Sequence, residues 1–160
     1  MGNVANIKEA LHAIADECNS NIELINRGGC AVYAVELAKR LEALGYDDYR
    51  IRTYGSRLNI AKVEQLITTT NAQATIWDWY NNGVTFDHVR LQWRGFMWDA
   101  EGAEKVADAT SWMGSGIQDG KISLEAMAKL AGSGRGWNFR FNRNQIPEMR
   151  SIMDEYLTVN

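Results

Sequence analysis

Three residues of this 160-residue chain carry side chains that serve nucleophilic catalysis: Cys30, His88 and Asp99. In such chemistry a thiolate attacks a carbonyl carbon, an imidazole moves the proton, and a carboxylate orients the imidazole and stabilises its charge. The three groups must touch, although they are far apart in the chain. The local sequence around each of them predicts elements that would make this contact.

Cys30 lies at the predicted start of a helix that ends near Gly45. Gly28 and Gly29 precede it, and glycine permits backbone angles and close approaches that side chains forbid. The first turn of a helix has unpaired N–H groups, which lower the pKa of a cysteine and can donate to an oxyanion. The predicted inward stripe of this helix is Cys30, Ala34, Leu37, Leu41 and Leu44.

Two predicted strands, at residues 84–93 and 96–102, form a hairpin if Arg94-Gly95 is a two-residue turn. In that register Asp99 is the diagonal neighbour of His88, within reach of a hydrogen bond between the carboxylate and the imidazole. The face that they share is predicted to hold His88, Arg90, Gln92, Met97, Asp99 and Glu101.

The same register leaves other partners open. Arg90 lies directly opposite Asp99, so the two could form only a surface ion pair. Glu101 lies directly opposite His88 and is a rival for the orienting acid. A histidine within a sheet is compatible with a structural role, and Cys30 is compatible with an ordinary buried cysteine.

The remaining pattern predicts an α+β fold, in which the helix of Cys30 packs on one face of a small antiparallel sheet. Residues 103–120 are predicted to be mostly irregular. The hydrophobic residues of the hairpin are expected to divide between its two faces, so we expect other elements to cover both faces. These residues are Val89, Leu91, Trp93, Phe96 and Trp98. Further helices are predicted at residues 4–24, 60–69, 123–132 and 146–157, and a further strand at 49–55.

The runs NRGGCAVYAVELAKRL, FDHVRL and WDAEG resemble the papain-like superfamily, in its compact, transglutaminase-like variants. Similar patterns occur in short proteins of bacteria and their phages. The resemblance covers residues 20–102 and implies a single papain-like domain over residues 1–160, with a C-terminal helical extension at 121–160. It implies that Cys30 is the nucleophile, His88 the general base and acid, and Asp99 the orienting residue.

The sequence departs from papain at two points. Ala31 follows the cysteine in place of an aromatic residue, and no glutamine occurs among residues 20–29. Asn26 is therefore the candidate side chain for the oxyanion hole. Gly29 and Trp137 are further candidates for contact with substrate.

The resemblance implies a cysteine-dependent hydrolase or acyltransferase that acts on an amide, isopeptide or thioester bond through an acyl-enzyme. The expected substrate is a protein or peptide. The alternative, from a different class, is a papain-like protein whose site has decayed and which binds or inhibits a host or partner protein.

Composition excludes several other functions. A net charge of -3 argues against a dedicated nucleic-acid binder, and no apolar run is long enough to span a bilayer. Two cysteines and two histidines are too few for a disulfide framework or a structural zinc site, so we expect no metal or cofactor. Free thiols favour a reducing compartment, the cytoplasm.

Basic and aromatic residues alternate near the C-terminal end, in the segment GRGWNFRFNRNQ. Such a pattern can stack bases and neutralise phosphates. The favoured interpretation is instead an amphipathic segment whose aromatic residues pack on the sheet, because the rest of the chain is acidic.

Overall fold

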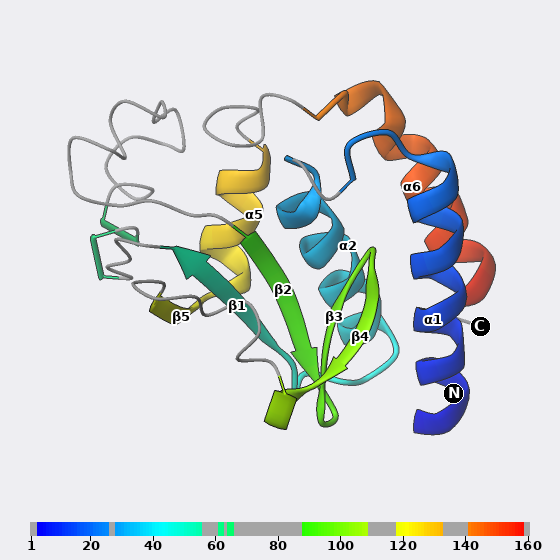
Figure 1. Cartoon of the computed structure of the whole chain (residues 1–160), viewed down its shortest axis with the longest axis horizontal. Helices are drawn as coiled ribbons and strands as arrows, with labels where there is room; N and C mark the ends of the chain where they lie inside the picture. The colour runs from blue at the N-terminus through cyan, green and yellow to red at the C-terminus, as the bar shows by residue number, and fades with distance from the viewer. Residues whose placement is uncertain are drawn as a thin grey trace.

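The computed structural model describes residues 3–25, 28–55, 61–62, 64–65, 88–108, 118–132 and 141–158. Within these residues the fold is α+β, as predicted, with one five-stranded antiparallel sheet and four α-helices. The helices are α1 (Val4–Asn21), α2 (Cys30–Ala43), α5 (Leu124–Gly132) and α6 (Ile146–Tyr156) (Figure 1). The helical residues 61–62 and 64–65 fall inside the predicted helix at 60–69, and the rest of that helix lies outside the described residues.

The strands are β1 (Arg50–Gly55), β2 (His88–Trp93), β3 (Phe96–Asp99), β4 (Gly102–Lys105) and β5 (Gln118–Ile122). Their order across the sheet is β4-β3-β2-β1-β5, and every neighbouring pair is antiparallel. Strands β2, β3 and β4 therefore form a meander, whereas β5 returns to the opposite edge beside β1.

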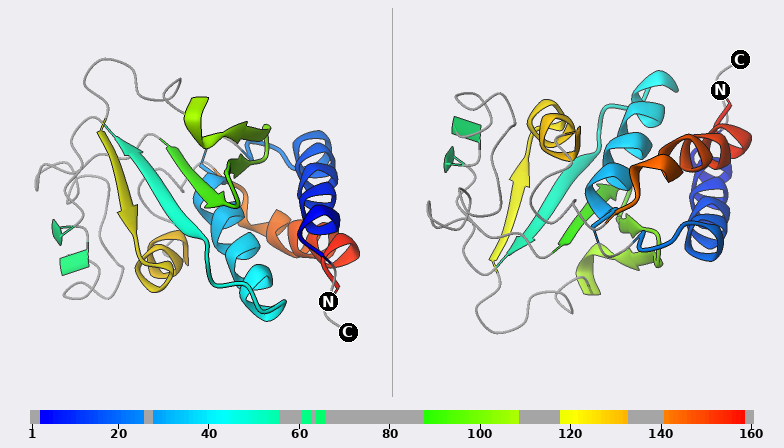
Figure 2. Two further views of the ribbon diagram at one scale, coloured as in Figure 1. Left: turned by 90° about the horizontal axis from the view of Figure 1, so that it is seen from below. Right: turned by 90° about the horizontal axis from the view of Figure 1, so that it is seen from above.

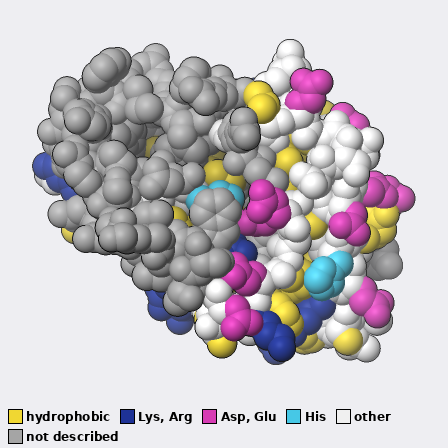
Figure 3. Space-filling model, in the orientation of Figure 1, with side chains coloured by type: hydrophobic (Ala, Val, Ile, Leu, Met, Phe, Trp, Pro, Cys, Tyr) yellow, Lys and Arg dark blue, Asp and Glu magenta, His cyan; other side chains and the backbone are white. Residues whose placement is uncertain are grey.

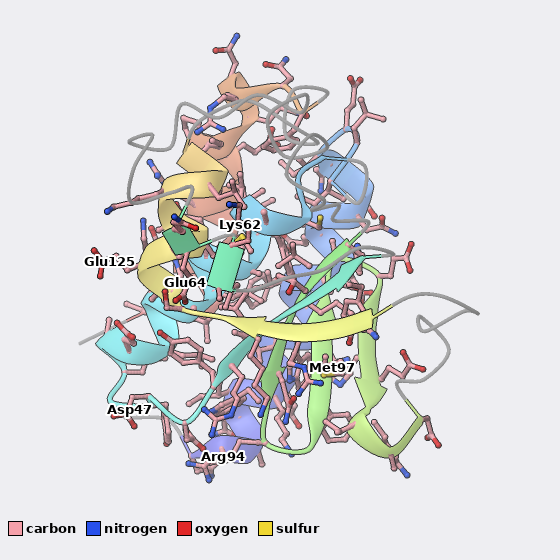
Figure 4. The ribbon with its side chains drawn as sticks, turned by 90° about the vertical axis from the view of Figure 1, so that its left-hand side faces the viewer. Asp47, Lys62, Glu64, Arg94, Met97 and Glu125 are labelled. Atoms are coloured by element: carbon pink, nitrogen blue, oxygen red, sulfur yellow. The ribbon has the colours of Figure 1, made fainter. Side chains whose placement is uncertain are left out.

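The register predicted for the β2–β3 hairpin is confirmed, because Trp93 pairs with Phe96 and Leu91 pairs with Trp98. The two turn residues, Arg94 and Gly95, have φ angles of 50° and 86°. Positive φ at both central residues matches the right-handed twist of the flanking strands. Arg94 lies at the end of the molecule where this turn projects (Figure 4).

The expectation that the hydrophobic residues of the hairpin divide between two faces is wrong. Directly paired residues in an antiparallel ladder point to the same side. The pairs Leu91 with Trp98 and Trp93 with Phe96 therefore share one face, and Val89 joins them by alternation. Helix α2 covers this face, and α1 packs on it at β3, where His12 contacts the Trp98 ring and Lys8 lies over the Phe96 ring. Helix α6 lies beyond α2 (Figure 2). The polar residues of the hairpin all fall on the other face.

Helix α2 occupies the centre of the molecule. Its residues from Cys30 to Ala38 are all buried, because the sheet, α5 and α6 surround it. One charge lies within this layer: Glu36 of α2 accepts from Arg40 at 2.9 Å and from the Nε of Arg150 of α6 at 3.0 Å. These two arginines lower the pKa of Glu36 against the opposing effect of burial. The ion pairs thus tie α2 to α6.

The C-terminal segment contributes to the same core. Strand β5 pairs with β1, and buried residues of α5 and α6 belong to the core cluster that contains α2. Ser123 caps α5 through a 3.2 Å hydrogen bond from the Ala126 N–H, and Pro147 lies in the first turn of α6, as predicted. The irregular structure expected for residues 103–120 is wrong where β4 and β5 form. Neither strand has an alternating apolar pattern, so neither could be predicted from its sequence.

The N-terminal helix agrees with its predicted stripe. Ile7, Leu11, Ile14 and Cys18 are all buried in α1.

None of the described helices is both long enough and apolar enough to cross a membrane. On the described part of the face seen in Figure 3, acidic side chains are spread widely and basic side chains gather toward the edges.

Candidate active site

The turn before α2 determines where the cysteine lies. Gly28 has a φ of 106°, and Gly29 is the N-terminal cap of the helix. A Cβ added to Gly29 would lie 2.7 Å from the carbonyl oxygen of Ile25 and 2.9 Å from a ring carbon of Phe141. Glycine is therefore required here by close packing, as its place before Cys30 suggested.

The same turn is held from the C-terminal side of the chain. Gln145, in the short 3-10 helix Arg143–Gln145, accepts a hydrogen bond from the Glu23 N–H at 2.8 Å and donates to the Glu23 carbonyl at 3.1 Å. Together with Phe141 against Gly29, these bonds fix the path that leads into Cys30.

We predict that Gly29→Ala destabilises the protein by about 1–3 kcal/mol, because the new methyl group would displace backbone as well as the Phe141 ring. Chemical denaturation measures this change. Gly132→Ala is the matched control, since a Cβ there meets no atom within 4 Å. Equal free energies of unfolding for the Gly29 and Gly132 variants would contradict the packing argument.

His88 and Asp99 form the predicted diagonal contact. His88 Nε2 lies 2.8 Å from Asp99 Oδ2, and the two residues are only 1% and 3% exposed. The other carboxylate oxygen, Oδ1, accepts from the Glu101 N–H at 2.8 Å. Glu101 is exposed and reaches Asp99 through its backbone, so Asp99 and not Glu101 is the acid at the ring nitrogen.

Cys30 also acts on this imidazole. A hydrogen bond to Cys30 and the charge of Cys30 are among the causes that raise the pKa of His88, whose Nε2 is bonded to Asp99. Helix α2 and strand β2 begin at the same end of the molecule (Figure 1). The three predicted residues therefore meet.

The electrostatics favour a charged imidazole. Burial lowers the pKa of His88, but hydrogen bonds to Asp99 and Cys30, together with their charges, raise it to about 9. A positive charge on the ring stabilises both a thiolate and a carboxylate beside it. Low exposure keeps water away and strengthens both attractions.

The alternative partner of Asp99 is also present. The Nε of Arg90 lies 3.2 Å from Asp99 Oδ2, the same oxygen that contacts His88. Arg90 is 3% exposed, so this is a buried ion pair and not the surface pair expected from the sequence. Asp99 Oδ2 is therefore in contact with both His88 and Arg90.

Sequence reasoning missed an aromatic neighbour of the site. Tyr54 of β1 pairs with His88 across the β1–β2 ladder, and the two ring centroids are 6.4 Å apart. Tyr54 is buried and packs beside the imidazole. The strand YRIRTYG was predicted from the sequence, but only its register with β2 places Tyr54 beside His88.

Two predicted contact residues, Asn26 and Trp137, lie outside the described residues. The basic and aromatic segment is described only from Phe141 onward. There Phe141 is buried against the turn before α2, and Arg143 donates to the carbonyl of Ala131 at 2.8 Å. Phe141 is therefore buried, as the packing interpretation expects, but against this turn and not on the sheet.

A hollow of about 540 Å³ adjoins the loops of the site. It is lined by residues 19–25, which precede the turn to Cys30, and by Glu101, which follows Asp99. Leu24 on its rim is 48% exposed and has a φ of 58°, an uncommon angle for a leucine.

No group of three or more potential metal ligands occurs among the described residues. Comparisons with protein-family models, curated proteins and solved structures found no match to this chain. The functional assignment therefore rests on the geometry of Cys30, His88 and Asp99.

Proposed function

We propose that this protein is a cysteine-dependent hydrolase or acyltransferase that acts on an amide, isopeptide or thioester bond. The observation that carries the proposal is a single imidazole, that of His88, hydrogen-bonded to both Asp99 and Cys30. The position of Cys30 at the first residue of α2 supports it further, because backbone N–H groups of the first helical turn are available to an oxyanion.

The proposed reaction begins when the Cys30 thiolate attacks the substrate carbonyl carbon. A carbon–sulfur bond forms, and the electron pair of the carbonyl moves to its oxygen, which the first turn of α2 stabilises. The His88 imidazolium then gives its proton to the leaving amine or thiol as the bond to it breaks. The product is a thioester on Cys30 and a neutral imidazole.

The second half of the cycle releases the acyl group. Neutral His88 takes a proton from water, or from an acceptor amine, as its oxygen or nitrogen attacks the thioester carbonyl. Collapse of the intermediate expels the Cys30 thiolate and leaves the imidazolium. Asp99 stays ionised throughout and stabilises the positive ring.

We further propose a papain-like arrangement for the fold. It is supported by a central helix that begins at the cysteine and packs on an antiparallel sheet, and by the order Cys30, His88, Asp99 along the chain. The assignment of Asn26 to the oxyanion hole stays a prediction from the sequence, because this residue lies outside the described residues. The hollow between residues 19–25 and Glu101 is the proposed side of substrate approach.

One observation favours the alternative of a decayed site that serves binding. Cys30 is only 3% exposed, so its sulfur offers little surface to a substrate. The two functions differ in the reactivity of this sulfur: a working nucleophile must be open to a small electrophile and must react at mildly acidic pH.

Alkylation by iodoacetamide between pH 5 and pH 10 tests the proposal without a substrate. We expect Cys30 to react already at pH 6, as a thiolate paired with imidazolium, and faster in a second step near pH 9, where His88 loses its proton. The sign follows from the raised pKa of His88: below about 9 the ring keeps its charge and holds the thiolate, and above it the thiolate is released.

Peptide mass mapping assigns the modified residue, and Cys18 serves as the internal control because it is fully buried. A Cys30 that stays unmodified at pH 6 and reacts in one step, like an ordinary thiol, would favour the binding function. A variant His88→Ala is expected to lose the step near pH 9.

A further inference from the structure

Arg90 joins the site to the neighbouring edge strand β4. Its Nε lies 3.2 Å from Asp99 Oδ2, and its Nη1 donates to Glu104 Oε2 of β4 at 2.9 Å. Arg90 Nε makes no hydrogen bond of good geometry, although it is buried. Its contact with Asp99 is therefore one of charge, at an oxygen whose hydrogen bond is with His88.

The charged and titratable groups around this pair come from several elements. Asp99 faces His88 and Arg90 of β2, and its charge also acts on the buried Tyr33 hydroxyl of α2. Arg90 faces Glu104 of β4 and Arg52 of β1, its ladder partner. Burial raises the pKa of Tyr54 of β1, while the charge of Arg90 and a hydrogen bond to it act to lower that pKa. Within this group Arg90 is the cation in direct contact with Asp99, apart from His88 itself.

We propose that Arg90 is a positioning residue, which balances the negative charge of Asp99 so that His88 binds its proton firmly enough to stabilise Cys30 but can still release it. The inference rests on the proposed function, because it assigns Arg90 a role in the proton transfer of that site. Sequence reasoning treated Arg90 and His88 as competing partners of Asp99. The two contacts instead work together.

The charges determine the sign of the effect. Removing a buried positive charge beside Asp99 leaves the carboxylate uncompensated, so it attracts the imidazolium proton more strongly. His88 should then lose its proton at higher pH. A unit charge within roughly 6 Å in a partly screened interior shifts a titration by about one pH unit.

The test compares Arg90→Met, which keeps length but not charge, with Arg90→Lys, which keeps charge. The readouts are the second step of iodoacetamide alkylation and the NMR titration of the His88 ring, with near-UV circular dichroism to show that each variant is folded. We expect Arg90→Met to raise the titration by about one pH unit and Arg90→Lys to move it by less than about 0.3.

A third variant keeps the proposal testable if Arg90→Met does not fold. Glu104→Gln removes the other carboxylate in contact with Arg90, at a half-buried position on β4. The guanidinium charge is then less compensated, so the His88 titration should fall by about 0.3 to 0.5 pH units. Opposite signs in the Arg90 and Glu104 variants would not follow from a purely structural role.

The proposal is overturned if the folded variants leave the His88 titration unchanged, or if Arg90→Met lowers it. Failure of the proposed function gives a different result: Cys30 of the wild-type protein would not react at pH 6. The NMR titration of His88 would still report the effect of Arg90 in that case, because it needs no reaction at Cys30.

Discussion

Cys30→Ala is expected to abolish catalysis, with a loss of roughly 10⁴-fold or more in turnover, because the proposed acyl intermediate forms on the Cys30 sulfur. Hydrolysis of an activated ester such as p-nitrophenyl acetate supplies the rate, and intact-protein mass spectrometry detects the acyl adduct. The fold should survive the change, since the substitution removes only a sulfur atom at the first residue of α2.

Cys18→Ala is the matched control. Burial, with the charges of Glu17 and Glu148, raises the pKa of Cys18 to about 12, so this residue stays a thiol at neutral pH. The control variant should retain the ester hydrolysis rate and the acyl adduct. An adduct that persists in Cys30→Ala and disappears in Cys18→Ala would remove Cys30 from the mechanism.

Asp99→Asn is expected to lower turnover by about 10²- to 10⁴-fold while the side-chain volume is kept. The amide cannot stabilise the imidazolium as a carboxylate does, and the hydrogen bond that Asp99 accepts is one of the causes that raise the pKa of His88. The second step of Cys30 alkylation should therefore move below pH 9. The pH dependence of alkylation and the ester rate measure the two effects independently.

The same variant should also be less stable, by about 3 kcal/mol, since Arg90 loses a buried ionic partner. Glu101→Gln separates the two candidate acids. Its side chain is exposed and its backbone N–H remains, so we expect little change in rate. A larger loss in Glu101→Gln than in Asp99→Asn would make Glu101 the orienting acid.

The sequence predicted the hairpin well because its turn is local. A two-residue loop at Arg94 and Gly95 allows one register, and that register alone places Asp99 beside His88. The start of α2 was equally local, since two glycines precede Cys30 and an apolar stripe follows it. Both halves of the site could therefore be predicted separately.

Other features depend on pairing between distant segments. Tyr54 lies beside His88 only because β1 pairs with β2, and no pattern within β1 gives that register. Strands β4 and β5 are edge strands with few apolar residues, so their sequences resemble loops. Asp99 contacts both His88 and Arg90. Only the three-dimensional distances reveal this, because the pairing of the strands presents the two residues as alternative partners.

Two contacts described above have a consequence for synthesis on the ribosome: Gln145 hydrogen-bonds Glu23, and Phe141 packs against Gly29. Cys30, the proposed nucleophile, is synthesised more than one hundred positions before Phe141 and Gln145, the residues that fix its approach. A nascent chain therefore carries a cysteine whose surroundings are incomplete. We expect Cys30 to gain its proposed reactivity only after these two residues have left the exit tunnel and folded back.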